Sequence, residues 1–252
     1  MTTTGDVVGR AEAILRAACG DRVRTRFELA ALTSFRIGGP AALFLEPETD
    51  PDLVAVSEAV RQTGIKVAIL GKGSNVLVAD EGFPGLVLRL GRGYRWSARD
   101  GDRLTAGGAM PLPALAGVAL AHGLSGLEFG VAIPASLGGS VRMNAGAHGG
   151  SLADVVESVD VFGLANGAPQ RLGADDAGFS YRRSDLPAGG VIVGATVRLA
   201  TGDPGAIRRG RPRSSARIRP ARPGWPRRTP APRARGPAPP RRARAAASRR
   251  PR

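Results

Sequence analysis

The sequence predicts an α+β fold built from two lobes, followed by a basic tail. A unit of the βαβ kind spans about residues 35–78, and short strands separated by Gly and Asp turns follow from Gly85. Two glycine-rich loops, Leu70–Gly82 and Ile133–Gly149, each adjoin an apolar segment. From Arg208 onward the composition changes, with 17 Arg and 10 Pro in 45 residues and no acidic residue. These three observations predict two lobes that carry loops for close contact with a ligand, and an irregular tail.

The predicted domain boundaries follow these changes in composition. Residues 1–25 form an N-terminal helix with its connection, and residues 26–203 form the two-lobed domain, with lobes at about 26–72 and 73–203. Residues 204–252 are predicted to be disordered, because they contain almost no large apolar side chain whose burial could offset chain entropy. A natural basic tail would bind nucleic acid weakly. We favour the alternative that a GC-rich gene is read out of frame here, which yields this Arg/Pro/Ala/Gly mixture.

The elements of the first lobe are predicted from apolar spacing and from signals at helix ends. Asp6–Ala18 has apolar residues at helical spacing, and Gly20 can end that helix. A second helix begins at Asp50, which we expect to cap it, and runs to about Gln62. The predicted strands of this lobe are Phe35–Ile37, Ala41–Leu45, Val67–Leu70 and Val76–Val78.

The second lobe is predicted to be an antiparallel sheet with two helical segments. A helix starts at Pro111 and runs to Ala121, with Gly123 beyond its end, and Leu137–Met143 forms one helical turn of small residues. The predicted strands are Leu86–Leu90, Tyr94–Ser97, Arg103–Ala106, Val155–Phe162, Gln170–Leu172 and Val191–Leu199.

The first glycine-rich loop has the composition of an anion-binding loop. Gly71 and Gly73 leave room for positive φ, so that successive N–H groups can point toward a pyrophosphate, and Ser74 and Asn75 add side-chain hydrogen bonds. The loop does not match the dinucleotide fingerprint, because Val76 stands in place of the third glycine. It does not match a P-loop either, since Gly73 follows the lysine. Taken alone, an ordinary tight turn explains this loop equally well.

Six motifs along the chain resemble those of the UDP-N-acetylenolpyruvoylglucosamine reductases of peptidoglycan synthesis, in the same order. Along the chain they are SFRIGGPA, LGKGSNVLVADEG, TAGGAM, GLSGLEF, IPASLGGSVRMNAGAHG and FSYRRS. The resemblance covers about Arg26–Leu199. It implies an FAD-binding domain of the vanillyl-alcohol-oxidase-like (PCMH) type, with FAD as cofactor, NADPH as hydride donor and a UDP-sugar as substrate.

The resemblance also assigns residues to the cofactor and to the substrate. The implied cofactor-binding residues are Gly71, Lys72, Gly73, Ser74, Asn75, Val76, Gly107, Gly108, Ile133, Pro134, Gly138, Gly139, Asn144 and Gly146. Arg182 is the arginine of the Y-R-x-S motif, and its guanidinium suits the substrate carboxylate on which negative charge develops during hydride transfer. Arg183 beside it fits an ordinary surface ion pair. His148 stands where the family more often has tyrosine, and we assign it no catalytic role.

Two functional groups of the resembled family have no counterpart in this sequence. Its proton-donor serine lies in a G-S-x-F-x-N-P motif, which is absent after Leu199, and its C-terminal glutamate is missing because no acidic residue follows Asp203. Both groups belong to the family's third, substrate-binding domain. We therefore expect this chain to retain FAD binding and to lack, or nearly lack, turnover.

Composition bounds the remaining possibilities. Residues 1–207 carry 19 basic and 21 acidic residues, so the net charge of +15 arises in the tail and no specific nucleic-acid partner is expected for the body. Cys19 is the only cysteine and the two histidines stand apart, which argues against disulfides and metal sites. Without a signal segment or an apolar run of about 18 residues, we predict a cytoplasmic, non-membrane, monomeric protein. An oxygen-using flavoprotein oxidase of the same superfamily and nucleic-acid binding through the tail are the alternatives.

Overall fold

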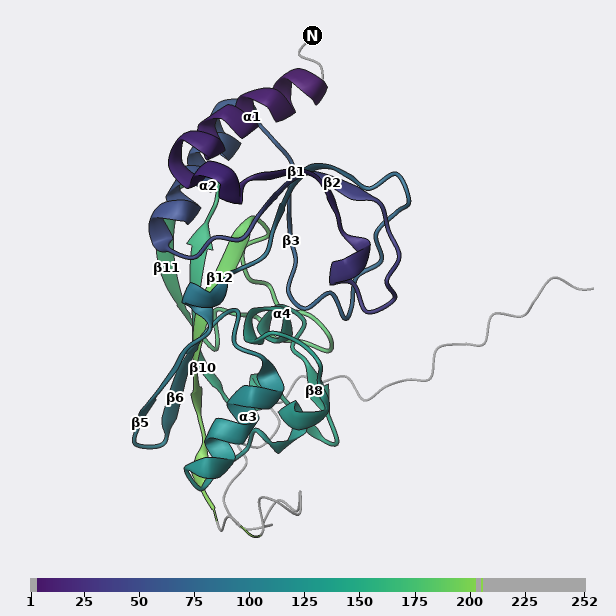
Figure 1. Ribbon diagram of the computed structural model, residues 1–252. Helices are drawn as coiled ribbons and strands as arrows, with labels where there is room; N and C mark the ends of the chain where they lie inside the picture. Colours follow the sequence, from purple (N-terminus) through teal and green to yellow (C-terminus); the bar gives the residue numbers. More distant parts are fainter. Residues whose placement is uncertain (1–3, 203–204, 206–252) are drawn as a thin grey trace, which may run out of the picture. The chain divides into compact units, whose positions relative to one another are not determined.

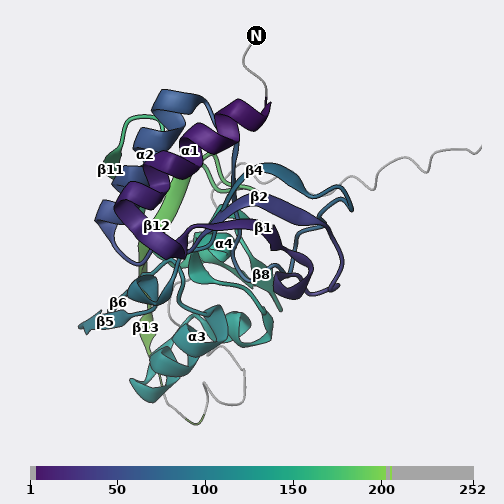
Figure 2. The same cartoon turned by 45° about the horizontal axis from the view of Figure 1, so that its top comes forward.

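The first sheet lies in the N-terminal part of the chain and is covered by two helices. The structure, a computed structural model, describes residues 4–202 and 205. The first sheet has the order β1-β2-β4-β3. Its strands are β1 (Arg24–Glu28), β2 (Pro40–Leu45), β3 (Val67–Ile69) and β4 (Phe83–Leu88). Strand β1 is antiparallel to β2, whereas β4 runs parallel to both of its neighbours. Helices α1 (Thr4–Cys19) and α2 (Asp50–Thr63) lie side by side against this sheet (Figures 1 and 2).

Local sequence signals fix the ends of α2. The cap is Thr49, one residue before the predicted cap, and it forms a capping box with Asp52, whose carboxylate accepts from the Thr49 backbone N–H at 3.1 Å. Asp50 is instead the first helical residue, where a negative charge is favourable. Gly64 closes the helix with a φ of 69°, a conformation that glycine adopts without strain.

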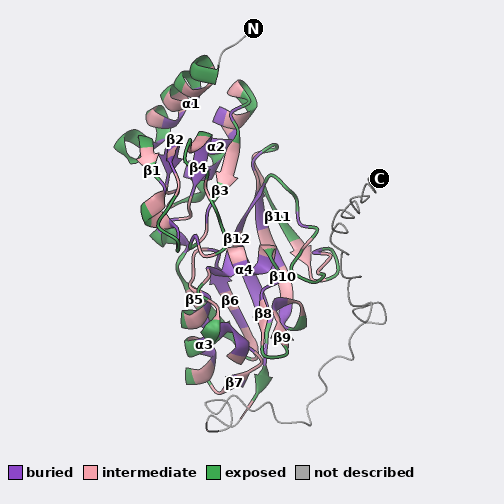
Figure 3. Cartoon of the chain, turned by 90° about the vertical axis from the view of Figure 1, so that its right-hand side faces the viewer, coloured by how far each residue is buried: buried purple, intermediate pink, exposed green. Residues whose placement is uncertain are grey.

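The second sheet is antiparallel throughout, as predicted, with the order β11-β10-β12-β6-β5. Its strands are β5 (Ser97–Asp100), β6 (Arg103–Gly107), β10 (Val156–Gly163), β11 (Ala168–Gly173) and β12 (Gly190–Arg198). Helices α3 (Leu112–Ala121) and α4 (Leu137–Arg142) pack on it and share one core with β6, β10 and β12. Figure 3 shows that β6 and β12 are mostly buried, whereas the outward surface of α1 is exposed.

Short elements complete the described chain. Two two-stranded sheets pair β7 (Leu124–Ser125) with β13 (Ala200–Thr201), and β8 (Gly146–Ala147) with β9 (Gly150–Ser151). The 3₁₀ turns are η1 (Gly20–Arg22), η2 (Ala30–Leu32), η3 (Arg92–Tyr94), η4 (Glu128–Ala132) and η5 (Leu152–Asp154). Among the described residues, no helix is both long and apolar enough to cross a bilayer. Apart from residue 205, residues 204–252, which are predicted to be disordered, lie outside the described part of the chain.

The two sheets share a hydrophobic cluster, which we call the shared core. It brings Phe162 and Leu164 of the second-sheet region against Leu53 and Val56 of α2. The hydroxyl of Ser57 on α2 also donates to the Leu164 carbonyl at 2.9 Å. The two lobes therefore pack against each other through this shared core, in addition to being linked by the backbone.

Two predicted strands are absent, and a third belongs to the other sheet. The segment near Leu86 joins the first sheet as β4, so the chain of the first lobe extends past the predicted boundary at about residue 72. Phe35–Ile37 and Val76–Val78 are irregular loops. These loops hydrogen bond to one another instead of to a sheet, through the pairs Ser34 N–H to Gly73 C=O at 3.0 Å and Gly39 N–H to Ala79 C=O at 2.9 Å. Phe35, Ile37, Val76 and Leu77 are correspondingly exposed, whereas Val78 is partly buried.

Two further elements are shifted. The predicted strand at Tyr94–Ser97 divides into the 3₁₀ turn η3, which ends at Tyr94, and β5, which begins at Ser97. Tyr94 is buried and its hydroxyl donates to Asp50 at 2.7 Å, so this residue packs against α2 and does not lie in a strand. Strand β3 ends at Ile69, one residue before the predicted end, and Ile69 is 43% exposed because it lines a cavity.

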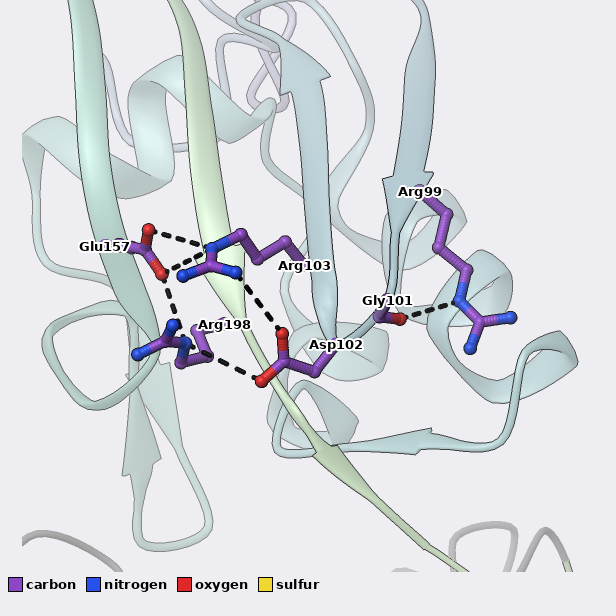
Figure 4. A network of polar contacts seen from close by, with 6 residues as sticks. All are labelled: Arg99, Gly101, Asp102, Arg103, Glu157 and Arg198. Atoms are coloured by element: carbon purple, nitrogen blue, oxygen red, sulfur yellow. Dashed lines mark hydrogen bonds and ion pairs between the residues drawn. The ribbon is translucent and has the colours of Figure 1, made fainter.

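A network of ion pairs joins the ends of three strands of the second sheet (Figure 4). The Glu157 carboxylate accepts from Arg103 at 2.9 Å and pairs with Arg198 at 3.2 Å. The Asp102 carboxylate pairs with the same two arginines at 3.7 and 3.6 Å. Two carboxylates and two arginines therefore form one network across β10, β12 and the start of β6, and pairs as exposed as these contribute modestly to stability.

Candidate functional site

A cavity of about 370 Å³ lies where β3, the start of β12 and helix α4 meet. It is lined by Val67, Ile69, Leu70, Gly71, Lys72, Arg89, Leu90, Arg95, Gly108, Ala109, Pro111, Ser136, Gly138, Gly139, Arg142, Ala188, Gly190, Val191 and Ile192. The lining combines apolar strand residues, several glycines and four cationic side chains, a composition typical of a binding cavity for a ligand with apolar and anionic parts.

The glycines let three backbone segments meet at one wall of the cavity. The Gly138 N–H donates to the Gly108 carbonyl at 2.9 Å, and the Gly108 N–H donates to the Val193 carbonyl at 2.7 Å. A Cβ at Gly108 would collide with the Ile192 carbonyl oxygen, and one at Gly138 would lie 3.0 Å from that oxygen. Only glycine permits this approach, which leaves bare backbone facing the ligand space.

The structure brings the two glycine-rich loops together, as the sequence predicts. Gly71 of the first loop packs so closely on Ser136 of the second that a Cβ at Gly71 would lie 2.7 Å from the Ser136 Oγ. Ser136 caps helix α4, and its Oγ accepts from the Gly139 N–H at 3.4 Å. Both loops therefore contribute to the same cavity.

The charged groups that line the cavity are all cationic. They are Lys72, Arg89, Arg95 and Arg142, and the lining includes no Asp or Glu. Arg89 has a distant partner in Glu46 at 3.8 Å, and burial lowers the pKa of Arg142. Lysine and arginine side chains in this arrangement favour a phosphate-bearing ligand. Within residues 4–202 and 205, no three His, Cys, Asp or Glu side chains are grouped so as to hold a metal ion.

Five of the predicted cofactor residues line the cavity, namely Gly71, Lys72, Gly108, Gly138 and Gly139. The other nine lie outside its lining: Gly73, Ser74, Asn75, Val76, Gly107, Ile133, Pro134, Asn144 and Gly146. Their contact with a cofactor stays a prediction. Sequence reasoning missed Arg89, Arg95 and Arg142. Arg142 lies within the second glycine-rich loop, so its position in that motif could have indicated that it lines the cavity. Arg89 and Arg95 lie outside the six motifs, and nothing in the sequence around them indicates a place in the cavity.

The conformation of the first loop agrees only in part with the predicted nest. Gly73 has a φ of 65°, as expected, whereas Gly71 does not have positive φ. A Cβ at Gly73 would collide with the Leu32 carbonyl oxygen, so this glycine is also required for packing against the neighbouring loop. Val76, predicted to begin a strand, lies in an irregular loop and is 37% exposed.

Asn144 is buried and connects the second loop to the segment that carries Arg182. Its Nδ2 donates to the Ser180 carbonyl at 2.8 Å, and its Oδ1 accepts from the Ala153 N–H at 2.9 Å. Asn144 also has a φ of 40°, which an asparagine tolerates better than most residues. Its contacts make it an anchor for the Ser180 turn.

The Ser180 turn separates the roles of its two arginines. Arg183 forms the surface ion pair expected of it, with Asp185 at 3.0 Å. Arg182 is exposed, has a φ of 57°, and lies 5.9 Å from the centre of the Tyr181 ring. Within residues 4–202 and 205, no ion pair involves Arg182, so its guanidinium is available to a ligand carboxylate; that role stays a prediction.

Comparison with known proteins places these features in a family. The family described as "FAD binding domain" matches residues 41–173. The chain is similar to the UDP-N-acetylenolpyruvoylglucosamine reductase of Heliobacterium modesticaldum, with 44% identity over 178 residues, covering 70% of this chain and 56% of the relative. It is 44% identical over 199 residues to the enzyme of that name from Anaeromyxobacter sp. strain Fw109-5, covering 79% and 61% of the two chains.

Solved structures give the same result. The crystal structure of UDP-N-acetylenolpyruvylglucosamine reductase from Thermus caldophilus superposes with a TM-score of 0.66 at 37% identity, covering 75% of this chain and 66% of that one. Physcomitrella patens BBE-like 1 superposes with a TM-score of 0.58 at 16% identity, covering 75% of this chain and 44% of that one, which supports the fold alone. The predicted fold class and family resemblance are confirmed. The chain spans 56% and 61% of the length of the two curated relatives above.

Proposed function

The chain belongs to the FAD binding domain family, and from this premise we propose that its cavity holds FAD as part of an oxidoreductase of the UDP-N-acetylenolpyruvoylglucosamine reductase kind. One observation carries the proposal: four cationic side chains and a wall of bare glycine backbone line the same cavity, and no carboxylate of the described residues lines it. A dinucleotide with a diphosphate and flat rings matches this lining in both charge and shape.

The cavity residues divide the work of binding between charge and shape. Lys72, Arg89 and Arg95 would face the diphosphate, because they line the cavity and form no close ion pair among the described residues. Gly108 and Gly138 would allow a ring to lie directly on backbone atoms. When bound, FAD supplies hydride chemistry, which no side chain can provide.

The substrate is proposed from the relatives whose names state it. We assign to this chain a UDP-sugar bearing an enolpyruvyl group, with NADPH as reductant, in the synthesis of a peptidoglycan precursor. Arg182 would bind the carboxylate of that group, because a guanidinium engages both oxygens of a carboxylate. The cytoplasmic location and monomeric state stay predictions.

Turnover by this chain is expected to be absent or very weak. No G-S-x-F-x-N-P motif follows Leu199 in this sequence, so the proton-donor serine expected from the resembled family has no counterpart in it. Loss of a positioned proton donor lowers a rate by about 10²–10⁴. The unmatched part of the relatives' length would have to supply this group.

The test measures binding and turnover separately on the full 252-residue chain. Titration with FAD, followed by flavin fluorescence, should give saturable binding, weakened when Arg89 and Arg95 are both changed to Gln. NADPH oxidation that depends on UDP-N-acetylglucosamine enolpyruvate should occur with the Heliobacterium modesticaldum relative and not with this chain. Absence of FAD binding would refute the cofactor assignment, and equal oxidation rates would refute the expected loss of turnover.

A further inference from the structure

One guanidinium connects helix α4 to the segment Leu186–Gly190. Arg142 Nη1 donates to the Leu186 carbonyl at 2.8 Å, and its Nη2 donates to the carbonyls of Pro187 at 2.9 Å and Gly190 at 3.0 Å. Among the described residues no ion pair involves Arg142, so three carbonyls of one short segment take the place of a counter-ion. Hydrogen bonds from a charged donor to carbonyls are stronger than neutral ones, which makes this contact a strong anchor for the segment.

The anchored segment forms one wall of the cavity. Ala188 and Gly190 line the cavity, and Val191 and Ile192 continue the wall into β12. Arg142 itself lines the cavity together with Gly138 and Gly139 of α4. The same side chain therefore holds the wall in place and adds positive charge to the space that the wall encloses.

The ends of this segment are fixed, since Leu186 is buried in the core and Gly190 pairs with Gly163 in the second sheet, but its middle has few other contacts. Pro187, Ala188 and Gly189 are exposed. Outside the strand pairing, the Gly189 carbonyl accepts from the Leu164 N–H at 3.1 Å, and the Gly190 N–H donates to the Pro187 carbonyl at 3.0 Å. The exposed residues 187–189 have few backbone bonds, so their position depends on side-chain anchors.

We propose that Arg142 is a positioning residue that locks the Leu186–Gly190 wall and thereby sets the affinity of the cavity for its anionic ligand. The identity of that ligand rests on the proposed function, whereas the locking of the wall does not. If the wall were disordered before binding, the ligand would have to order it, and the free energy of ordering would lower the affinity. A wall that Arg142 already holds in place avoids this cost.

The experiment compares wild type with Arg142→Gln and Arg142→Lys in the full chain. Hydrogen exchange of residues 185–190, measured by mass spectrometry without ligand, reports the wall directly. Arg142→Gln keeps a planar donor but loses the charge and most of the reach, so exchange should accelerate about tenfold or more. The FAD dissociation constant should rise by about tenfold or more. Arg142→Lys keeps the charge and should restore part of both properties.

Arg99→Gln is the matched control. Arg99 also donates to a backbone carbonyl, that of Gly101 at 2.9 Å, but it is exposed and does not line the cavity (Figure 4). This variant should leave both measurements unchanged. If Arg99→Gln accelerated exchange of residues 185–190 as much as Arg142→Gln does, the effect would be nonspecific and the proposal would fail.

The two readouts keep the proposal separate from the proposed function. Unchanged exchange in Arg142→Gln would overturn the positioning role, even if FAD bound more weakly, because the guanidinium would then act only as a charge. If Arg142→Gln does not fold, Arg142→Lys decides, and wild-type exchange in that variant overturns the role. A wild-type chain that does not bind FAD refutes the proposed function, and the exchange measurement still decides the role of Arg142.

Discussion

Replacing Asp52 by Ala should destabilise the protein more than most single substitutions, because this carboxylate is buried and has several partners. Its side chain is 7% exposed and binds both terminal nitrogens of Arg22, at 2.6 and 2.7 Å. It also accepts the backbone N–H groups of Glu48 at 2.8 Å and Thr49 at 3.1 Å, which cap α2. The contact therefore joins the start of α2 to the end of the N-terminal helix region.

The size of the effect follows from these contacts. Removing one partner of a buried ion pair raises the free energy of the folded state by about 3–5 kcal/mol. Because the Arg22 side chain is 43% exposed and can regain water, the lower end of that range applies. We expect about 3 kcal/mol for Asp52→Ala, which corresponds to a Tm lowered by about 6–12 °C for a chain of this size. Asp52→Asn keeps some hydrogen bonds and should lower stability by about half as much.

The pH dependence gives a second, independent check. The Arg22 hydrogen bonds hold the pKa of Asp52 well below its usual range. The stability that this group contributes is therefore complete above the unfolded pKa of about 3.9 and is lost as pH falls through the lower folded pKa. The stability difference between wild type and Asp52→Asn should consequently shrink below about pH 4.

Urea unfolding followed by circular dichroism at several pH values measures both effects. Asp21→Asn is the control, because Asp21 is fully exposed and lies 3.9 Å from Arg16, so its loss should change stability by less than about 0.5 kcal/mol. If Asp52→Ala lowered the unfolding free energy by less than about 1 kcal/mol, the reasoning would be refuted. The same holds if the stability difference between wild type and Asp52→Asn did not depend on pH.

Three further perturbations test other parts of the structure. Ser74→Asp should weaken FAD binding if the first loop lies near the diphosphate, and unchanged flavin fluorescence titration would argue against that placement. Tyr94→Phe removes the 2.7 Å bond to Asp50 and should lower the unfolding free energy by about 1–2 kcal/mol, measured by urea denaturation; no change would mean that the bond is replaced by water. Glu157→Gln breaks the network of Figure 4 and should lower stability by about 1 kcal/mol or less, with the difference from wild type decreasing at high salt; a salt-independent difference would contradict an ionic origin.

Elements whose signals are local were predictable from the sequence. Helix α3 begins directly after Pro111 and ends before Gly123, as predicted from these two residues. Helix α4 ends at Arg142, one residue before the end of the predicted helical turn. Strand β12 is recognisable as an apolar run because it is buried at the centre of its sheet. In these cases propensity, end signals and burial all agree.

The failures arose where pairing depends on distant residues. The sequence of β4 does not indicate whether it joins β2 or β6, and its parallel pairing to β2 and β3 depends on the crossover through α2. The Val76 loop has strand-like composition, but it pairs with another loop and stays exposed. The glycine-rich loops of the cavity could be predicted because close backbone packing there leaves no room for a side chain, and the sequence therefore shows glycine. It missed Arg89 and Arg95 because a cation that lines a cavity has no local signature.

The shared core determines how the protein can be divided. Because Phe162 and Leu164 fill space beside Leu53 and Val56, a fragment that ended after the first sheet would expose an apolar surface that its own residues cannot cover. The two halves should therefore not fold as separate fragments, although mixing them could restore the native state. The two sheets should therefore unfold in a single cooperative transition. A destabilising substitution in either sheet should also disturb the cavity, because residues of both sheets line it.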